Sequence, residues 1–176
     1  EIDAGLWDVI HEFSLNTFRR HGHDHYLSAA FFKHLAQAVP DMIMVKLAVY
    51  RSRPVAAAIF FVGTDALYGR YWGAAAEFDS LHFETCYYQG IEYCIERGLA
   101  RFEPGTQGEH KVPRGFEPSM TCSAHWLADA RFASAIAAHL RQEGVAVDEY
   151  MAGIREHLPF RRGEDKPGGP FDLEPH

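Results

Sequence analysis

The feature that most restricts the fold is an unbroken apolar run, Val55–Val62, which reads VAAAIFFV. Such a run without a polar interruption is typical of a central strand that is covered on both faces. Val45–Tyr50, which alternates apolar and polar residues, precedes it, and the aromatic-rich Ala66–Trp72 follows it. Short turns at Arg51–Pro54 and Gly63–Asp65 separate the three segments. The pattern therefore predicts an antiparallel meander of three strands.

A helix and a further strand follow the meander. Leu81–Arg97 has the apolar periodicity of a helix that Gly98 closes. Its expected N-cap is Asp79 or Ser80. Leu99–Glu103 is short and apolar enough to be the next strand, and a strand–helix–strand unit makes a right-handed parallel crossover. We therefore predict an α+β fold with α/β/α layers, in which a mixed sheet, antiparallel first and then parallel, has helices on both faces.

The remaining segments add helices around this sheet. Ser28 is the expected N-cap of the second helix. The expected helices are Asp3–Arg20, Ala29–Ala38, Ala128–Gln142 and Val147–His157. Thr121–Trp126 is a candidate strand. Residues 1–160 are expected to form a single domain, and residues 161–176, rich in Pro and Gly, a flexible tail.

The charge and cysteine content exclude some classes of protein. A net charge of −7 over 176 residues argues against broad, nonspecific binding of nucleic acid, which needs a basic surface. No apolar run approaches the length of a membrane-spanning helix and no signal peptide is visible, so a cytoplasmic protein is expected. Cys86, Cys94 and Cys122 lack close metal-ligand spacing and fit reduced thiols there. The chain opens with Glu1, which leaves open that it is a piece of a longer protein, and no oligomeric state is predicted.

The segment from Phe102 to Trp126 concentrates ionisable residues between prolines and glycines. Pro and Gly predict an irregular loop there rather than a regular helix. Catalytic and binding side chains often lie on loops that a rigid scaffold positions. The alternative is a solvated loop whose charges have no function. The residues that carry the site hypothesis are Glu103, Gln107, His110, Lys111 and Arg114.

A second cluster, His21, His23 and His25 with Asp24 between them, has the composition of a metal site, because imidazole is a common metal ligand. No distant partner ligand can be identified, and Gly22 fits a helix C-cap with solvated histidines beside it. We therefore predict no metal site. A metal-dependent enzyme that uses these histidines is the third alternative.

The order of two helices, a meander, a glycine turn into a helix and a parallel strand resembles the GNAT superfamily of acyltransferases. The pantetheine-phosphate loop of that superfamily has the form Arg/Gln-x-x-Gly-x-Gly/Ala, and RYWGAA at residues 70–75 fits it. The resemblance implies a turn whose backbone N–H groups bind the phosphates of the donor. The alternative is an ordinary turn, since Glu77 and Asp79 would repel phosphate. The implied cofactor-binding residues are Arg70, Gly73, Ala74 and Ala75.

A closer resemblance is to a bacterial GNAT-like group related to the Fem-type peptidoglycan aminoacyltransferases. It rests on residues 54–74 (PVAAAIFFVGTDALYGRYWGA), 78–99 (FDSLHFETCYYQGIEYCIERGL) and 102–126 (FEPGTQGEHKVPRGFEPSMTCSAHW). Fem-type enzymes carry two such domains in tandem. The resemblance therefore implies that residues 1–160 form one GNAT-like domain, the C-terminal one of a longer protein. No established catalytic residue transfers with it.

The implied reaction moves an acyl group from acyl-CoA or aminoacyl-tRNA to an amine, in cell-wall metabolism. It needs a base for the amine proton, stabilisation of the oxyanion and a binding site for the donor. Glu103 or His110 is the candidate base, and Tyr71 is the candidate acid for the leaving group. Lys111 and Arg114 are candidates for pairing with donor phosphates or a substrate carboxylate. The other substrate-binding candidates are Gln107, Trp72 and Trp126, with the two indoles as walls of a sugar or nucleotide pocket.

Each of these residues also has a structural interpretation. Glu103 and Arg114 can form an ion pair, His110 can cap the loop, and the two tryptophans can belong to the core. The acidic chain favours acyl-CoA over tRNA as donor, because tRNA carries many phosphates. The alternative function is a non-catalytic GNAT-like domain that binds a peptidoglycan precursor or a partner domain.

Overall fold

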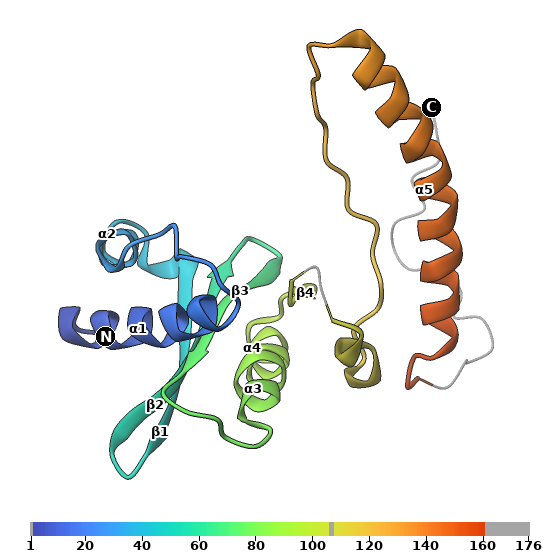
Figure 1. Ribbon diagram of the computed structural model, residues 1–176. Helices are drawn as coiled ribbons and strands as arrows, with labels where there is room; N and C mark the ends of the chain where they lie inside the picture. The colour runs from blue at the N-terminus through green and yellow to red at the C-terminus, as the bar shows by residue number, and fades with distance from the viewer. Residues whose placement is uncertain (1, 106–107, 161–176) are drawn as a thin grey trace. The chain divides into compact units, whose positions relative to one another are not determined.

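The computed structural model describes residues 2–105 and 108–160, so the predicted tail lies outside the described residues. The chain divides into two compact units, Glu1–Thr106 and Gln107–His176 (Figure 1). The single domain expected over residues 1–160 stays a prediction. None of the described helices combines the length and the apolarity that crossing a bilayer requires.

A four-stranded mixed sheet forms the centre of the first unit. Its strands are β1 (Ile43–Tyr50), β2 (Arg53–Val62), β3 (Ala66–Ala74) and β4 (Arg101–Glu103), in the order β1-β2-β3-β4. The first two pairings are antiparallel, whereas β4 pairs parallel to the start of β3. The predicted meander followed by one parallel step is therefore confirmed.

The apolar run predicted to be a central strand lies in the middle of β2. Ala57 and Ile59 belong to one hydrophobic cluster, and Ala58 and Phe60 belong to another. Because side chains alternate along a strand, the two clusters lie on opposite faces of the sheet. Both faces of β2 are covered, as the run predicts.

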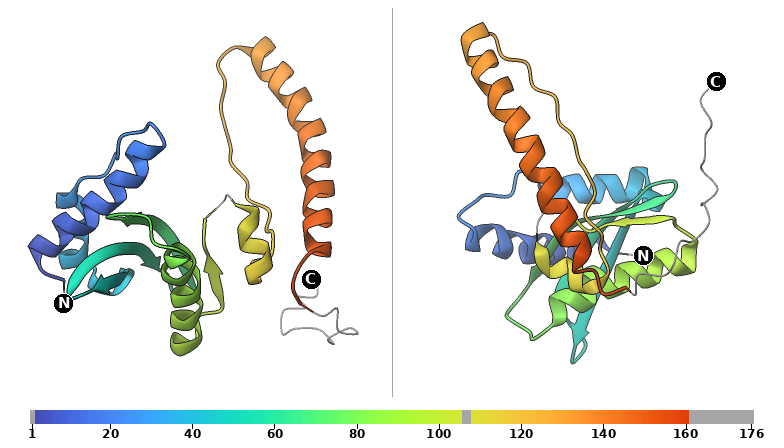
Figure 2. Two further views of the ribbon diagram at one scale, coloured as in Figure 1. Left: turned by 60° about the horizontal axis from the view of Figure 1, so that its bottom comes forward. Right: turned by 90° about the vertical axis from the view of Figure 1, so that its right-hand side faces the viewer.

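Two helices cover the first face (Figures 1 and 2). They are α1 (Ala4–Arg20) and α2 (Ala29–Ala38), as predicted from the sequence. Asp3 and Ser28 accept N-terminal N–H groups of the two helices, which satisfies backbone donors that otherwise lack partners. Trp7 stacks on Phe32 with 6.0 Å between ring centroids, so the helices pack on each other as well as on the sheet. A short 3₁₀ turn, η1 (Pro40–Met42), then leads into β1.

The second face is covered by one helical stretch with an interruption. It consists of α3 (Leu81–Phe83), a π-helical turn η2 (Glu84–Tyr88) and α4 (Gln89–Arg97), and Gly98 ends it in the left-handed conformation. Ser80 occupies the N-cap position, one of the two expected, but it has φ 59° and its side chain makes no capping hydrogen bond. The π turn shifts the helical phase, and the polar Thr85 is buried while the apolar Phe83 and Ile91 are only partly covered.

The second unit contains a 3₁₀ helix and one long α-helix. The 3₁₀ helix η3 (Glu109–Arg114) lies where only an irregular loop was expected. Helix α5 (Ala130–Glu156) replaces the two predicted helices. Gly144 lies inside it without ending the helix, and a Cβ at this position would meet no neighbouring group within 4 Å outside the helix's own backbone. The strand expected at Thr121–Trp126 is wrong: the segment is irregular and pairs with no strand among the described residues.

Helix α1 and strand β3 meet backbone to backbone at Gly73. A Cβ at this position would lie 1.9 Å from the carbonyl oxygen of Phe13. Real side chains do not approach a backbone oxygen so closely, and a helix backbone cannot move aside as a flexible side chain can. Only glycine therefore permits this approach of the helix to the sheet.

Replacing Gly73 by alanine is expected to lower the free energy of unfolding by about 2 to 3 kcal/mol, because the helix must move away from the sheet. Gly144→Ala makes the same chemical change in an open position of α5. It is expected to raise stability by about 0.5 to 1 kcal/mol through helix propensity. Urea unfolding followed by circular dichroism measures both, and equal effects of the two substitutions would contradict the close contact at Gly73.

Candidate functional site

The predicted phosphate-binding turn is the end of a strand. Arg70, Gly73 and Ala74 lie in β3, and the N–H group of Ala75 still donates to the carbonyl of Val55 at 2.8 Å. The turn expected at Gly73–Ala75 is therefore wrong, because β3 stays paired with β2 as far as Ala74. The next helix begins at Leu81, as predicted. Phosphate binding by these residues stays a prediction.

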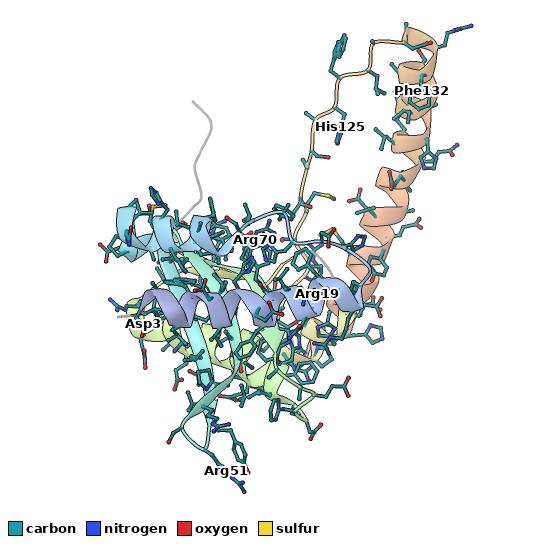
Figure 3. All side chains as sticks on the ribbon, turned by 60° about the vertical axis from the view of Figure 1, so that its left-hand side comes forward. Asp3, Arg19, Arg51, Arg70, His125 and Phe132 are labelled. Atoms are coloured by element: carbon teal, nitrogen blue, oxygen red, sulfur yellow. The ribbon has the colours of Figure 1, made fainter. Side chains whose placement is uncertain are left out.

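A β-bulge sets the direction of side chains in the middle of β3. Ile59 of β2 faces Tyr71, whereas the next residue, Phe60, faces Gly69, so Arg70 is the additional residue. Bulges of this kind redirect side chains and are frequent beside functional sites. The Arg70 guanidinium lies 4.6 Å from the Tyr71 ring and donates a hydrogen bond to the hydroxyl of Tyr26. Figure 3 shows Arg70 beside the segment that links α1 and α2.

Tyr71 is buried on the α1 and α2 face, inside an aromatic cluster. Its ring centroid lies 4.7 Å from that of His25 and 5.9 Å from that of Phe18. Burial raises the pKa of Tyr71, although the charge of Arg70 opposes the shift. Among the described residues, the hydroxyl of Tyr71 and Nε2 of His25 have no hydrogen-bond partner. A buried polar group without a partner costs about 1 to 3 kcal/mol.

Two histidines hold the backbone of Leu27 beside this cluster. Nε2 of His11 donates to the carbonyl of Leu27 at 2.8 Å, and the N–H group of Leu27 donates to Nδ1 of His25 at 3.1 Å. His25 is therefore neutral, with its proton on Nε2. Burial, and then the charge of His11, lower the pKa of His25. No group of three His, Cys, Asp or Glu in residues 2–105 and 108–160 has the arrangement of a metal site.

A cavity of about 450 Å³ opens at the end of β3. Trp72 belongs to the α4 face of the sheet, opposite Tyr71. Its indole meets the His82 ring edge-on at 5.4 Å between ring centroids, and the Tyr87 ring also meets the His82 ring edge-on, at 5.3 Å. These contacts fix the imidazole at the cavity. The lining residues are Arg20, Trp72, Ala74, Ala76, Glu77, Phe78, Asp79, Ser80 and His82.

Two of the residues that line this cavity, Trp72 and Ala74, were predicted as site residues, whereas Arg20 and His82 were missed. Arg20 ends α1, and its neighbour Arg19 is turned to an ion pair with Glu12 at 2.9 Å. The sequence around Arg19 and Arg20 does not indicate which of the two side chains lines a cavity. Their different surroundings arise only when α1 packs on β3.

The candidate base Glu103 lies on the surface of the first unit. Its side chain is about half exposed and lies 3.7 Å from Arg101, which also pairs with Asp65 at 3.2 Å. Ion pairs this exposed contribute little to stability. Glu103 is not among the residues that line the cavity.

Three predicted residues come together on η3 in the second unit. The guanidinium of Arg114 donates to the carbonyl of His110 at 2.5 Å. Burial, followed by the charges of Lys111 and Arg114, lowers the pKa of His110. Trp126 is 85% exposed in the extended segment that also carries His125 (Figure 3). The remaining candidate, Gln107, lies outside the described residues.

Replacing Tyr71 by phenylalanine removes the unpartnered hydroxyl and keeps the ring. The free energy of unfolding is expected to rise by about 1 kcal/mol. Tyr88→Phe, at a half-exposed position on the other face, is the control and is expected to change stability by less than about 0.5 kcal/mol. Urea unfolding measures both. A clear loss of stability in the Tyr71 variant would show that the hydroxyl has a partner in solution.

One known protein family matches the chain. The model of the FemAB-like family, described as peptidoglycan biosynthesis/recognition, matches residues 1–162. No curated protein matches the chain. Since the family match covers all the described residues, the chain belongs to the FemAB-like family of peptidoglycan biosynthesis and recognition.

Proposed function

We propose that this chain is an acyl- or aminoacyl-transferase of GNAT-like fold, which passes an acyl group from acyl-CoA or aminoacyl-tRNA to an amine of a cell-wall precursor. The observation that carries the proposal is the cavity at the end of β3, which is lined by Trp72 and Ala74 of the motif that resembles the GNAT superfamily. Family membership supports a peptidoglycan-related substrate. The cavity is proposed as the acceptor site.

The lining suits an acceptor that combines a sugar or apolar part with charged groups. The faces of Trp72 and Phe78 offer flat apolar surface, which suits stacking on a sugar ring. Arg20 can pair with a carboxylate through two parallel hydrogen bonds. Glu77 and Asp79 can accept hydrogen bonds from an ammonium group. A precursor that carries sugar, carboxylate and amine would use all three kinds of contact.

His82 is the proposed base. The amine must lose a proton as it attacks the acyl carbon, and imidazole is suited to this near neutral pH. Its ring contacts the rings of Trp72 and Tyr87, so the imidazole is oriented before a substrate arrives. The donor site is less well defined than the acceptor site. Lys111 and Arg114 on η3 remain candidates for binding the phosphates of the donor, and His110 remains the alternative base predicted from the sequence.

A non-catalytic binding domain is the second candidate function. It is favoured by the positions of two predicted catalytic residues, since Tyr71 is buried on the opposite face and Glu103 does not line the cavity. In that case the same cavity would bind a peptidoglycan precursor without acyl transfer. The cavity residues would then set affinity only.

Arg20→Gln is expected to weaken binding of a soluble muropeptide about tenfold, because a charge-assisted hydrogen bond is lost. Arg19→Gln is the matched control, since Arg19 is the preceding residue and pairs with Glu12 instead. Calorimetric titration of each full-length variant measures the two affinities. Equal affinities in both variants would refute the cavity as the acceptor site.

His82→Gln is expected to lower acyl transfer by a factor of about 100 or more, because the base is lost, while muropeptide binding stays within about twofold. His34→Gln, at an exposed position of α2, is the control. Transfer is followed by mass spectrometry of the muropeptide with acyl-CoA and with aminoacyl-tRNA as donors. Unchanged transfer in the His82 variant would refute its role, and binding without transfer in the wild type would establish the binding domain.

A further inference from the structure

Two histidines hold the backbone of the segment between α1 and α2, and the proposed function assigns them no role. Leu27 is held at both its backbone groups by imidazoles, the carbonyl by His11 and the N–H group by His25. We call His11, His25 and Leu27 the histidine latch. His11 comes from the middle of α1, so the latch ties residues 21–27 back onto that helix.

We propose that the histidine latch is a proton-operated switch. Protonation of His25 releases residues 21–27 from α1 and β3, and this changes the position of the Arg20 side chain in the wall of the cavity. The effect on the cavity rests on the proposed function. The release of the segment does not, because it follows from the hydrogen bonds alone.

Protonation reverses the role of the nitrogen that holds Leu27. Nδ1 of His25 accepts the N–H group of Leu27, and an imidazolium has no free lone pair because both its nitrogens donate. Two donors would then face each other. The other nitrogen, Nε2, offers no compensation, since it has no acceptor within the described part of the chain.

Burial and the neighbouring side chains of His25 disfavour the positive charge, and only the backbone hydrogen bond with Leu27 raises the pKa of His25. His11 faces it from α1, Tyr26 from its own segment, and Arg70 and Tyr71 from β3. From α2 the facing residue is Phe32, which carries no charge. None of these groups is a carboxylate. The neighbouring Asp24 is exposed and is not among the charges that act on His25.

The direction of the pH effect follows from these surroundings. Burial, and then the charge of His11, lower the pKa of His25 below 6.5 in the closed state and outweigh the backbone hydrogen bond with Leu27, which raises it. The released segment regains the ordinary pKa. The released state therefore binds more protons, so closure weakens as the pH falls below 6.5. The equilibrium for opening rises by up to about tenfold per pH unit, down to the pKa of the closed state.

The latch is connected to the cavity by a short stretch of chain. Arg20 lines the cavity and directly precedes the segment, whose first residue His21 closes α1 by donating to the carbonyls of Thr17 and Phe18. The segment is also held at Tyr26, whose hydroxyl accepts from Arg70. Release of residues 21–27 would loosen the end of α1 and with it the position of the Arg20 guanidinium.

Hydrogen–deuterium exchange of the full-length protein without ligand tests the switch. Peptides that cover residues 21–27 are compared at pH 7.5 and 5.5, after correction for the intrinsic pH dependence of exchange. The expected result is a several-fold loss of protection in this segment with no change in β2. His25→Asn keeps an acceptor for Leu27 and removes the titration, so its protection is expected to be independent of pH. His23→Asn, at an exposed position of the same segment, should behave as the wild type.

A loss of protection that persists in the His25→Asn variant, or no loss in the wild type, would overturn the switch. If that variant does not fold, nitrogen-15 NMR of the wild-type histidines decides. His25 is expected to carry its proton on Nε2 at pH 7.5 and to titrate below 6.5. A proton on Nδ1, or titration at or above 6.5, would refute the proposal. Because none of these readouts needs a substrate, their failure is distinguishable from failure of the proposed function.

Discussion

The contact between α1 and β3 at Gly73 is the constraint on which the rest of the first unit depends. The absence of a side chain there lets the carbonyl of Phe13 approach the strand. The approach places Trp7 and Ile10 against the sheet and brings the end of α1 to the cavity through Arg20. A wider separation would open the core and move Arg20 away from Trp72. One glycine thus links the stability of the unit to the shape of the candidate site.

Side chains of strand β3 alternate after the bulge, so neighbouring residues lie in two different environments on opposite faces of the sheet. Tyr71 enters the aromatic cluster beneath α1 and α2, and Trp72 borders the cavity on the α4 face. Without the additional residue at Arg70, the residues after it would exchange faces relative to those before it. The bulge therefore decides which aromatic ring is buried in the core and which is available to a ligand.

The sequence predicted the features that rest on local signals. The apolar run of β2 and the cap Ser28 are recognisable within a few residues, and both are confirmed. The end of β3 was wrong because RYWGAA does not reveal that pairing with β2 continues to Ala74. The site was predicted only in part for a related reason. Trp72 lies within a motif, but the roles of Arg20 and His82 arise from tertiary packing.

The π turn η2 connects the candidate base to the packing of the core. His82 must reach Trp72 on β3, and Gly90 must leave room for the ring of Phe102, from which a Cβ would be only 2.5 Å away. In a regular α-helix, residues eight apart point in directions that differ by roughly 80°. One additional residue in the turn reduces the difference to roughly 20°, so both positions can face the sheet. The π turn therefore has a structural reason and a functional one: it lets a single helix close the core at Gly90 while it presents His82 to the cavity.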